Sequence, residues 1–518
     1  MARSARAGRR EWGGLALLAP PTMLLGLDVT ALYLVVPNLA ADLEPTAAET
    51  LWIMDVYGFL IAGLLITMGT LGDRIGRRRL LMIGMAAFAA ASVLAAFAPG
   101  APWLIAARAL LGAAGATLMP STLSLIGTMF TDARQRALAI GVWATMFALG
   151  MAAGPVAGGA LVSAFWWGAV FLVAVPVAAL VLAAAPVLLP EHRTRAGRID
   201  LPSVASSLVA LLSLVYAIKH AAAHGGDLRA AAAALIGGGA AVAFVRRQLR
   251  LREPLLDLRL FTGRAFSAAL GVLLVGLVGF GGVMFLVTQY LQLVEGLTPT
   301  EAGLLMGPPA LAMLAGAIGA PLLARRVSPG IVMAATLALS LSGYALLARA
   351  GTDDEPTVIA GFAFVYLGLG VVAALGTDIV VGSAPPERSG SAAALSETVQ
   401  ELGIAVGVAV LGSLTAVVYR GTVEVPAGLS AAAAETYGDG LAGAASLADG
   451  LPAGALDPAR AAFTGGLNTA AAVAGIAVAA AALACFTALR RVPPLGAPGP
   501  GARPEADAAG SLVGQERP

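Results

Sequence analysis

Apolar segments long enough to cross a membrane recur along almost the whole chain. A helix needs about 20 apolar residues to span the hydrocarbon core of a bilayer. Short polar or glycine-rich connections separate fourteen such segments, of which the seventh and eighth are the weakest. We predict helices at residues 13–38, 51–71, 80–98, 102–126, 137–162, 166–188, 201–219, 229–245, 265–293, 302–324, 329–348, 356–381, 390–418 and 464–489.

The connections between these segments differ in charge in an alternating way. If the N-terminus is cytoplasmic, the connections that fall inside hold most of the arginines. Five basic residues fall outside: Lys219, Arg229, Arg349, Arg420 and Arg460. Cytoplasmic connections of membrane proteins carry an excess of Lys and Arg. The pattern therefore predicts an even number of helices in the cytoplasmic (inner) membrane, with both termini in the cytoplasm.

The composition changes this picture little. Apolar residues make up 58% of the chain and charged residues only 12%, against about 25% charged in soluble domains. A large soluble helical enzyme would need polar faces on its outer helices, and these are almost missing from the pattern. A net charge of +2, without basic residues interleaved with aromatics, gives no nucleic-acid surface.

The few residues with metal or catalytic chemistry are scattered. Cys485 is the single cysteine, and it lies in the last apolar segment. His220 and His224 have helical spacing for a metal pair, but they fall in what we expect to be a short, solvated connection after Lys219. No phosphate-binding loop precedes Lys219. We therefore expect no cofactor, no metal and no enzyme activity.

The order of segments suggests a division of the chain. We expect a cytoplasmic N-terminus at 1–12, a first six-helix bundle at 13–188, and two inserted helices with their connections at 189–264. A second six-helix bundle would follow at 265–489 and include a long external connection at 419–463. Residues 490–518, rich in Pro, Gly and Ala, are typical of a disordered cytoplasmic tail.

The connection between the second and third helices carries a recognisable motif. Residues 69–81 read GTLGDRIGRRRLL. This resembles the GxLaDrxGrkxxl signature of the major facilitator superfamily. The resemblance implies a fold of two six-helix bundles plus two inserted helices, and a gating role for Gly69, Asp73, Arg74, Gly76 and Arg77. We expect Asp73 to stabilise the outward-open state at the positive end of the thirteenth helix.

Two further stretches agree with this resemblance. Residues 104–115 contain Arg108 in a pattern similar to the second motif of the family, with Leu111 replacing the usual Gln. Residues 150–159 read GMAAGPVAGG, similar to the GxxxGPxxGG antiporter motif. That motif consists here of Gly150, Gly154, Pro155, Gly158 and Gly159. Small residues of this kind let helices pack closely.

Other segments are similar to one branch of the family, the fourteen-helix drug:proton antiporters. Residues 27–30 (LDVT), 51–57 (LWIMDVY) and 392–403 (AAALSETVQELG) resemble exporters of quaternary ammonium compounds and viologens. The tenth segment, 302–324, departs from that branch because it contains no acidic residue.

Ionisable residues inside these helices are candidates for function, because a charge at mid-bilayer is costly. Helix geometry places Asp28, Asp55 and Arg108 at similar depth in the outer half. We assign these three residues to proton coupling, with a static salt bridge to Arg108 as the alternative role of the acids. Glu397 and Glu401, one turn apart in segment 13, would bind substrate. The aromatic candidates for substrate contact are Tyr57, Trp143 and Phe147, and ordinary packing is the alternative for each.

The function implied by the resemblance is proton-coupled export of lipophilic, cationic drugs. The predicted partners are such drugs, protons and membrane lipids, and the oligomeric state is left open. An exporter of an endogenous metabolite or antibiotic, which could be neutral, is the alternative. A membrane-embedded enzyme or scaffold is a third class, but no cluster of nucleophile and base residues supports it.

Overall fold

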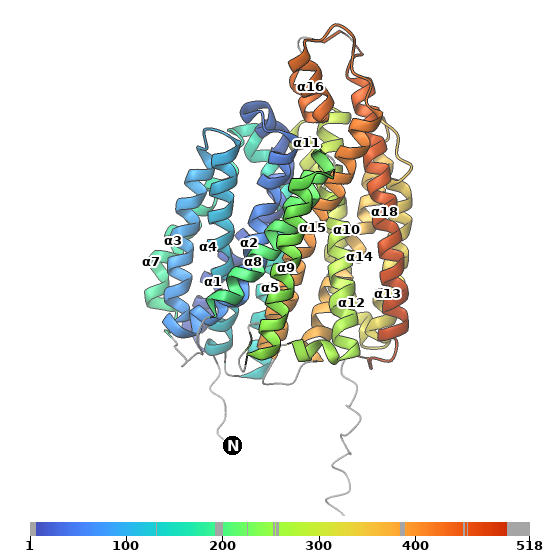
Figure 1. Ribbon diagram of the computed structural model, residues 1–518. Helices are drawn as coiled ribbons and strands as arrows, with labels where there is room; N and C mark the ends of the chain where they lie inside the picture. The colour runs from blue at the N-terminus through green and yellow to red at the C-terminus, as the bar shows by residue number, and fades with distance from the viewer. Residues whose placement is uncertain are drawn as a thin grey trace, which may run out of the picture.

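The computed structural model describes residues 7–130, 132–191, 200–224, 226–251, 254, 258–383, 389–448, 451–452 and 454–494. Every regular element in these ranges is a helix (Figure 1). Fourteen of the helical stretches are long and apolar enough to cross a membrane. The predicted number of spans is therefore confirmed. Most of the predicted tail, 495–518, lies outside the described residues.

The first part of the chain forms seven spans that alternate in direction, and the sixth span is divided into two helices. They are α1 (Arg9–Leu43), α2 (Ala47–Ile75), α3 (Arg77–Ala96), α4 (Ala101–Met129), α5 (Ala133–Ala164), α6 (Ala169–Leu172) with α7 (Ala174–Leu188), and α8 (Leu201–His224).

The remaining elements are α9 (Leu228–Arg250), η1 (Leu258–Thr262), α10 (Arg264–Gln289), η2 (Tyr290–Val294), α11 (Pro299–Leu305), α12 (Gly307–Ala324), α13 (Pro329–Leu347), α14 (Glu355–Gly382), α15 (Ser389–Thr422), α16 (Ala431–Asp439), α17 (Leu441–Ser446) and α18 (Asp457–Leu489).

Local sequence signals explain where several helices begin. Thr46 and Glu49 form a reciprocal capping box at the start of α2, and Thr298 and Glu301 do the same for α11. Each pair satisfies backbone N–H groups that a helix leaves without partners. Asp227 caps α9 by accepting a hydrogen bond from the backbone N–H of Ala230.

The structure corrects three of the predicted elements. The tenth predicted helix is divided into α11 and α12 at Met306, two residues before Pro308, which is followed by Pro309. Prolines have no backbone N–H to donate to the preceding turn of a helix. The external connection 419–463 is partly helical, since it holds α16 and α17. The seventh helix continues to His224 instead of ending at Lys219.

The helices pack in a pattern that occurs twice. In the first half, α1 packs on α5, α2 on α4, and α3 on α4 and α7. In the second half, α10 packs on α15, α12 on α14, and α13 on α14 and α18. Such a repeat is the internal symmetry of many secondary transporters. It supports two bundles of six spans, although the residue boundaries of the predicted domains stay a prediction.

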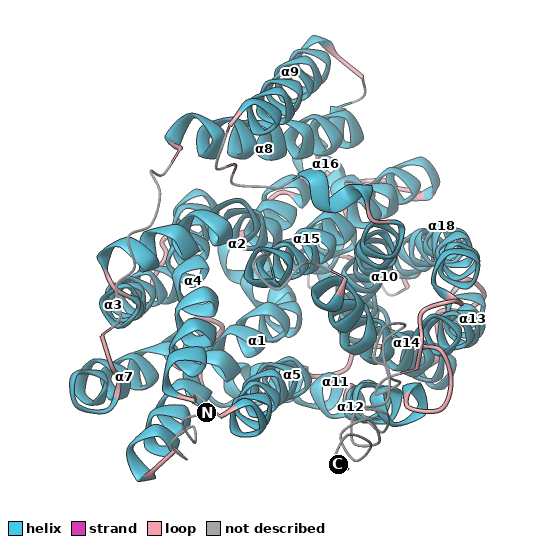
Figure 2. Cartoon of the chain, turned by 90° about the horizontal axis from the view of Figure 1, so that it is seen from below, coloured by secondary structure: helices cyan, strands magenta, loops and turns pink. Residues whose placement is uncertain are grey.

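The two remaining spans, α8 and α9, form a hairpin on the outside of the bundles. Figure 2 shows them side by side, next to α2 and α15. α8 contacts both of those helices, and α9 packs along α8.

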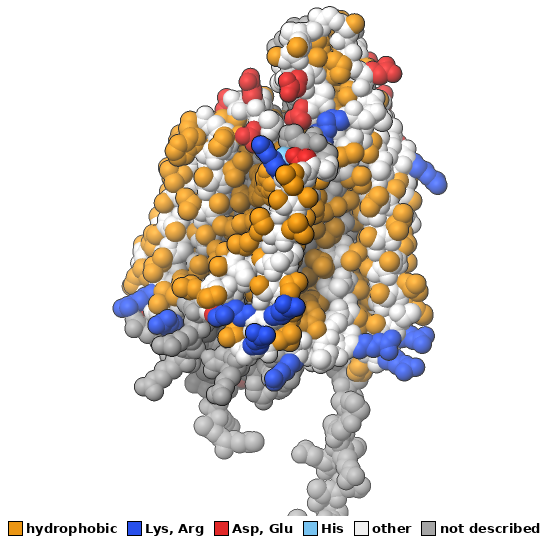
Figure 3. Space-filling view, in the orientation of Figure 1, with side chains coloured by type: hydrophobic (Ala, Val, Ile, Leu, Met, Phe, Trp, Pro, Cys, Tyr) orange, Lys and Arg blue, Asp and Glu red, His pale blue; other side chains and the backbone are white. Residues whose placement is uncertain are grey.

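The two bundles are joined at the end of the molecule where α16 lies, which we call the α16 end. There, Thr300 Oγ1 donates to Ser163 Oγ at 2.8 Å, and Asp439 accepts from the backbone N–H of Ala47 at 2.9 Å. Figure 3 shows an apolar surface between this end and a lower edge where most Lys and Arg side chains of that face gather.

Candidate functional site

A buried ion pair joins α1 to α4 in the interior of the first bundle. Arg108 Nη1 lies 2.8 Å from Asp28 Oδ2, and both side chains are buried. The same guanidinium donates through Nε to the carbonyl oxygen of Ile53 at 3.1 Å. Its carbon Cζ lies 4.4 Å from the centre of the Tyr57 ring, within the range of a cation–π contact. Arg108 therefore links α1, α2 and α4.

Asp55 forms an ion pair with a cation other than Arg108, the partner that the sequence suggested. Its Oδ2 lies 2.7 Å from Nζ of Lys219, which comes from α8. The expectation that Lys219 lies in an external connection is wrong, because the residue is buried inside α8. The alternative that Asp55 forms a salt bridge with Arg108 is not what the structure shows. Asp55 is 1% exposed, so its charge depends on this partner.

The expectation that His220 lies in a solvated connection is also wrong. His220 instead lies in α8, where its Nε2 is 2.9 Å from Asp227 Oδ2 at the N-cap of α9. The side chain of His224 lies outside the described residues. Among the described residues, no group of three or more His, Cys, Asp or Glu side chains could hold a metal ion.

A small cavity lies where the charged residues of several helices meet. Its volume is about 20 Å³, which is room for about one water molecule. The polar groups on its wall are Tyr33, Asp55, Tyr57, Arg108 and Glu401. The cavity therefore connects the charges of the first bundle with a carboxyl group of α15 in the second.

The two glutamates of α15 differ in their surroundings. Glu401 is buried and lines the cavity. Glu397 lies one turn earlier and is only partly buried. Near it, Gln400 and Ser396 approach Thr377 of α14. Of the pair assigned to substrate binding, Glu401 is the one that the structure brings to Arg108 and Asp55.

The aromatic candidates are divided in the same way. Tyr57 lines the cavity, whereas Trp143 and Phe147 lie on α5. The indole of Trp143 donates to Thr122 Oγ1 at 3.0 Å, and Phe147 is packed against the apolar core. Their role in substrate contact stays a prediction.

The glycines of the predicted antiporter motif bring α5 into close contact with α1. A Cβ atom on Gly150, Gly154 or Gly158 would collide with Met23, Thr30 or Ala31 of α1. Thr30 also donates to the carbonyl oxygen of Met151 at 2.9 Å. This packing fixes the part of α1 that carries Asp28.

The last glycine and the proline of the motif face the other bundle. A Cβ atom on Gly159 would collide with the backbone of Pro299, and one on Gly303 would lie 2.7 Å from the carbonyl oxygen of Pro155. These contacts bring α5 and α11 together, so the motif lies at the interface between the bundles.

The predicted gating motif forms the tight connection between α2 and α3. Gly76 has a φ of 111°, a backbone conformation that suits glycine. Arg77 is buried and donates to the carbonyl oxygen of Pro120 at 3.4 Å. Gly69 also approaches Pro120, and Arg74 is exposed. The side chain of Asp73 and the segment 384–388 lie outside the described residues, so the gating contact stays a prediction.

Lys219 is the site residue that sequence reasoning missed. A signal for it was present, because Asp227 is a good N-cap residue for the eighth span. A turn placed just before Asp227 would have extended the seventh helix past Lys219 and into the membrane.

Comparison with known proteins shows the family. A family model described as Major Facilitator Superfamily matches residues 19–408. The multidrug efflux pump LfrA of Mycolicibacterium smegmatis is 43% identical, over 94% of this chain and 98% of its own length. The methyl viologen resistance protein SmvA of Salmonella typhimurium is 34% identical, over 88% of this chain and 93% of its own.

A solved structure has the same fold. It is a bacterial homologue of the human lysosomal transporter Spinster, with a TM-score of 0.67 at 16% identity, covering 94% of this chain and 98% of that one. The motifs, the repeated packing and these matches agree. The chain therefore belongs to the major facilitator superfamily and is a multi-pass membrane transporter.

Proposed function

We propose that this transporter is a proton-coupled antiporter that exports lipophilic, cationic drugs across the cytoplasmic membrane. The observation that carries the proposal is the buried Asp28–Arg108 ion pair beside Glu401, where the two bundles meet. A carboxylate held by an arginine can exchange that partner for a proton. Charges inside a membrane commonly mark such proton and substrate pathways.

The distribution of charge supports the proposed orientation of the chain in the membrane. Arg and Lys side chains gather at the edge opposite the α16 end (Figure 3), and basic residues favour the cytoplasmic side. The α16 end then faces outside. In this orientation, Asp28 and Asp55 lie on the path of a proton that enters from outside.

The charges at the cavity support a cationic substrate. Among the residues that line the cavity or pair with its lining residues, acids outnumber bases. Arg108 and Lys219 balance Asp28 and Asp55, which leaves Glu401 as the further acid. Tyr33 and Tyr57 add aromatic surface to the same wall, and aromatic rings attract cations. One relative, SmvA, is a methyl viologen resistance protein.

An exporter of an endogenous antibiotic is the second candidate. The tetracenomycin C resistance and export protein of Streptomyces glaucescens is 34% identical, over 79% of this chain and 76% of its own length. The buried glutamate favours a cation over a neutral product.

Dye transport into inverted membrane vesicles tests the proposal. An imposed pH gradient, acidic inside, should drive uptake of a permanently charged dye by the wild-type protein. Asp28→Asn should abolish this uptake while the protein is still produced and still binds the dye. Normal gradient-driven uptake by a well-produced Asp28→Asn protein would show that the coupling site is elsewhere. Uptake of neutral drugs alone would favour the second candidate.

A further inference from the structure

The helix α8 covers the line along which the two bundles meet. Phe59 of α2, Val215 of α8 and Ala405 of α15 belong to one buried apolar cluster. Contacts between α2 and α15 run along the same line, where a Cβ atom on Gly58 would lie 3.1 Å from Cβ of Ala405. We call the line between α2 and α15 the bundle seam. Figure 2 shows α8 next to both helices of the bundle seam.

The rest of the hairpin faces away from the bundles. α9 packs along α8, and its Leu228 and Leu235 are 84% and 77% exposed. Apolar residues with this exposure suit contact with lipid. The position of the hairpin relative to the bundle seam therefore depends on the contacts made by the face of α8 that packs against α2 and α15.

That face of α8 carries a buried cation. Lys219 Nζ is 2.7 Å from Asp55 Oδ2 and 4.6 Å from the centre of the Trp52 ring. Both partners lie on α2, and Asp55 also lines the cavity with Arg108 and Glu401. The ion pair thus connects the inserted hairpin directly to the proposed transport site.

We propose that Lys219 is a positioning residue of the transport cycle, which holds α8 against the bundle seam while Asp55 is ionised and releases it when Asp55 takes up a proton. This inference rests on the proposed proton coupling. The added proton binds a carboxylate oxygen of Asp55, and Lys219 keeps its own protons. The inserted hairpin then takes part in the movement of the two bundles.

The surroundings of the pair give the physical reason. Two opposite charges in a dry interior are stable together, whereas one charge without the other is costly. The other ionisable groups that line the cavity with Asp55 are Tyr33, Tyr57, Arg108 and Glu401. Arg108 is already bound to Asp28, so it does not replace Lys219. A neutral Asp55 therefore leaves the buried ammonium group without a counter-charge, with only the Trp52 ring beside it, which favours separation of α8 from α2.

A permanent clamp is the competing explanation, and replacing both partners distinguishes the two. The double variant Asp55→Asn/Lys219→Met removes both charges and leaves no unpaired ion in the buried contact, so it should fold. If the ion pair only holds α8 in place throughout the cycle, dye transport by the double variant should depend on pH as in the wild-type protein. Our proposal predicts that the folded double variant loses the part of the pH profile that Asp55 contributes, while Lys219→Met alone loses most transport.

Cysteine cross-linking reports the position of α8 independently of transport. In a Cys485→Ser background, the pair Gly63→Cys/Leu208→Cys joins α2 to α8, since a Cβ atom on Gly63 would lie 2.5 Å from Leu208 Cδ2. The pair Leu214→Cys/Gly237→Cys joins α8 to α9 and serves as the control, because a Cβ atom on Gly237 would lie 2.8 Å from Leu214 Cγ.

At fixed pH, Asp55→Asn and Lys219→Met should each slow cross-linking of α2 to α8 several-fold and leave the control pair unchanged. The double variant should restore it. Arg247→Gln breaks the ion pair with Asp200 that joins α9 to the residue just before α8, and it should change cross-linking of neither pair of cysteines.

Two results would overturn the inference: unchanged α2–α8 cross-linking in Lys219→Met, or a wild-type pH profile in the double variant. Either result leaves the proposed antiport intact if Asp28→Asn still abolishes coupling. Failure of the Asp28→Asn test, with altered cross-linking in Lys219→Met, would instead overturn the coupling role of Asp28 and leave the role of the Asp55–Lys219 pair standing.

Discussion

Asp28 of α1 and Arg108 of α4 form a buried ion pair in which Oδ2 and Nη1 are 2.8 Å apart. Arg108 also donates to the backbone of Ile53 in α2. Three helices of the first bundle therefore share one guanidinium group. A change in the charge of Asp28 changes what holds these helices together, and this links protonation to conformation.

Removing only the cation of this pair should destabilise the protein strongly. Arg108→Met leaves the Asp28 carboxylate buried without a partner, and breaking a buried pair in this way costs about 3–5 kcal/mol. The double variant Asp28→Asn/Arg108→Met should lose less stability than Arg108→Met alone. Thermal unfolding in detergent measures the losses of Asp28→Asn, Arg108→Met and the double variant. If the losses of the two single variants simply add in the double variant, the two residues are not coupled.

The two glutamates of α15 should differ in their effect on substrate charge. Glu401 lines the cavity and Glu397 lies a turn away. We expect Glu401→Gln to weaken export of cationic dyes more than that of neutral drugs, because it removes a charge but keeps the shape. Glu397→Gln should show the same preference to a smaller degree. Dye and drug efflux measured side by side checks this, and equal losses for both substrate classes would indicate a structural or proton-coupling role.

The close contact of α5 with α1 should not tolerate a methyl group. Gly154→Ala places Cβ against Thr30 Oγ1, and overpacking of this kind typically costs about 1–3 kcal/mol. Gly141→Ala on the same helix is the matched control, because no atom lies within 4 Å of its Cβ position. The melting temperature should fall for Gly154→Ala only. Similar melting temperatures for the two variants would mean that α1 can move away from α5 at little cost.

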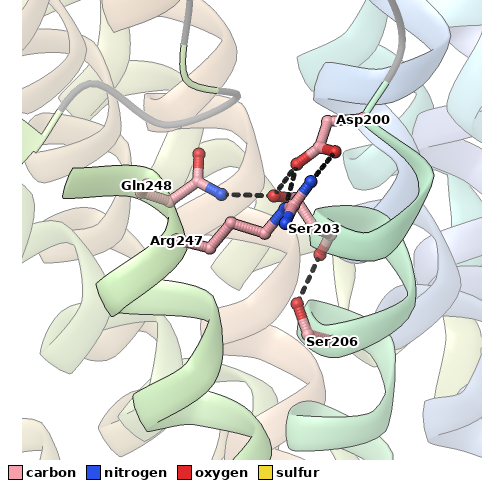
Figure 4. Close-up of polar contacts among 5 residues, drawn as sticks. All are labelled: Asp200, Ser203, Ser206, Arg247 and Gln248. Atoms are coloured by element: carbon pink, nitrogen blue, oxygen red, sulfur yellow. Dashed lines mark hydrogen bonds and ion pairs between the residues drawn. The ribbon is translucent and has the colours of Figure 1, made fainter. Parts of the chain in front are cut away.

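An ion pair joins α8 and α9 at the end of the hairpin away from their connecting turn, as Figure 4 shows. Arg247 Nη2 lies 2.6 Å from Asp200 Oδ1, and Gln248 donates to Ser203 Oγ at 2.7 Å. The hydrogen bond from Arg247 lowers the pKa of Asp200, just before α8, from 3.8 to about 2.

This shift predicts a stability effect confined to acid. The ionised form of Asp200 is favoured in the folded protein, so its contribution is full above about pH 4 and is lost as the pH falls toward 2. Melting temperatures of wild type and Asp200→Asn should differ by a constant amount from pH 8 to pH 5 and converge below pH 4. A difference that already shrinks near pH 6 would contradict the assigned pKa.

The sequence predicted the fourteen spans because each carries an apolar run of the length that a bilayer requires. It also predicted that Asp28, Asp55 and Arg108 lie at similar depth. Arg108 pairs with Asp28 and not with Asp55 because of the way each helix is oriented about its own axis in the bundle. The linear pattern does not determine that orientation. The break between α11 and α12 at Met306 is caused by Pro308 and Pro309. The mean hydropathy of the segment does not reveal it, because prolines change that mean little.

The Asp55–Lys219 pair was missed for a related reason. A lysine and a histidine in succession looked like the end of a span, so the seventh helix was ended too early. The long side chain of Lys219 instead meets its partner inside the bundle. Partners that lie far apart in the chain, here 55 and 219, need the packing of α8 on α2 before they can be recognised.

Proton movement driven by substrate is the most direct test of antiport. Proteoliposomes with a pH indicator inside and a clamped membrane potential would receive a permanently charged quaternary ammonium dye outside, at equal pH on both sides. Uptake of the dye by the wild-type protein should expel protons and make the interior alkaline, whereas Asp28→Asn should give no pH change. Dye accumulation by the wild-type protein without any proton movement would contradict the account.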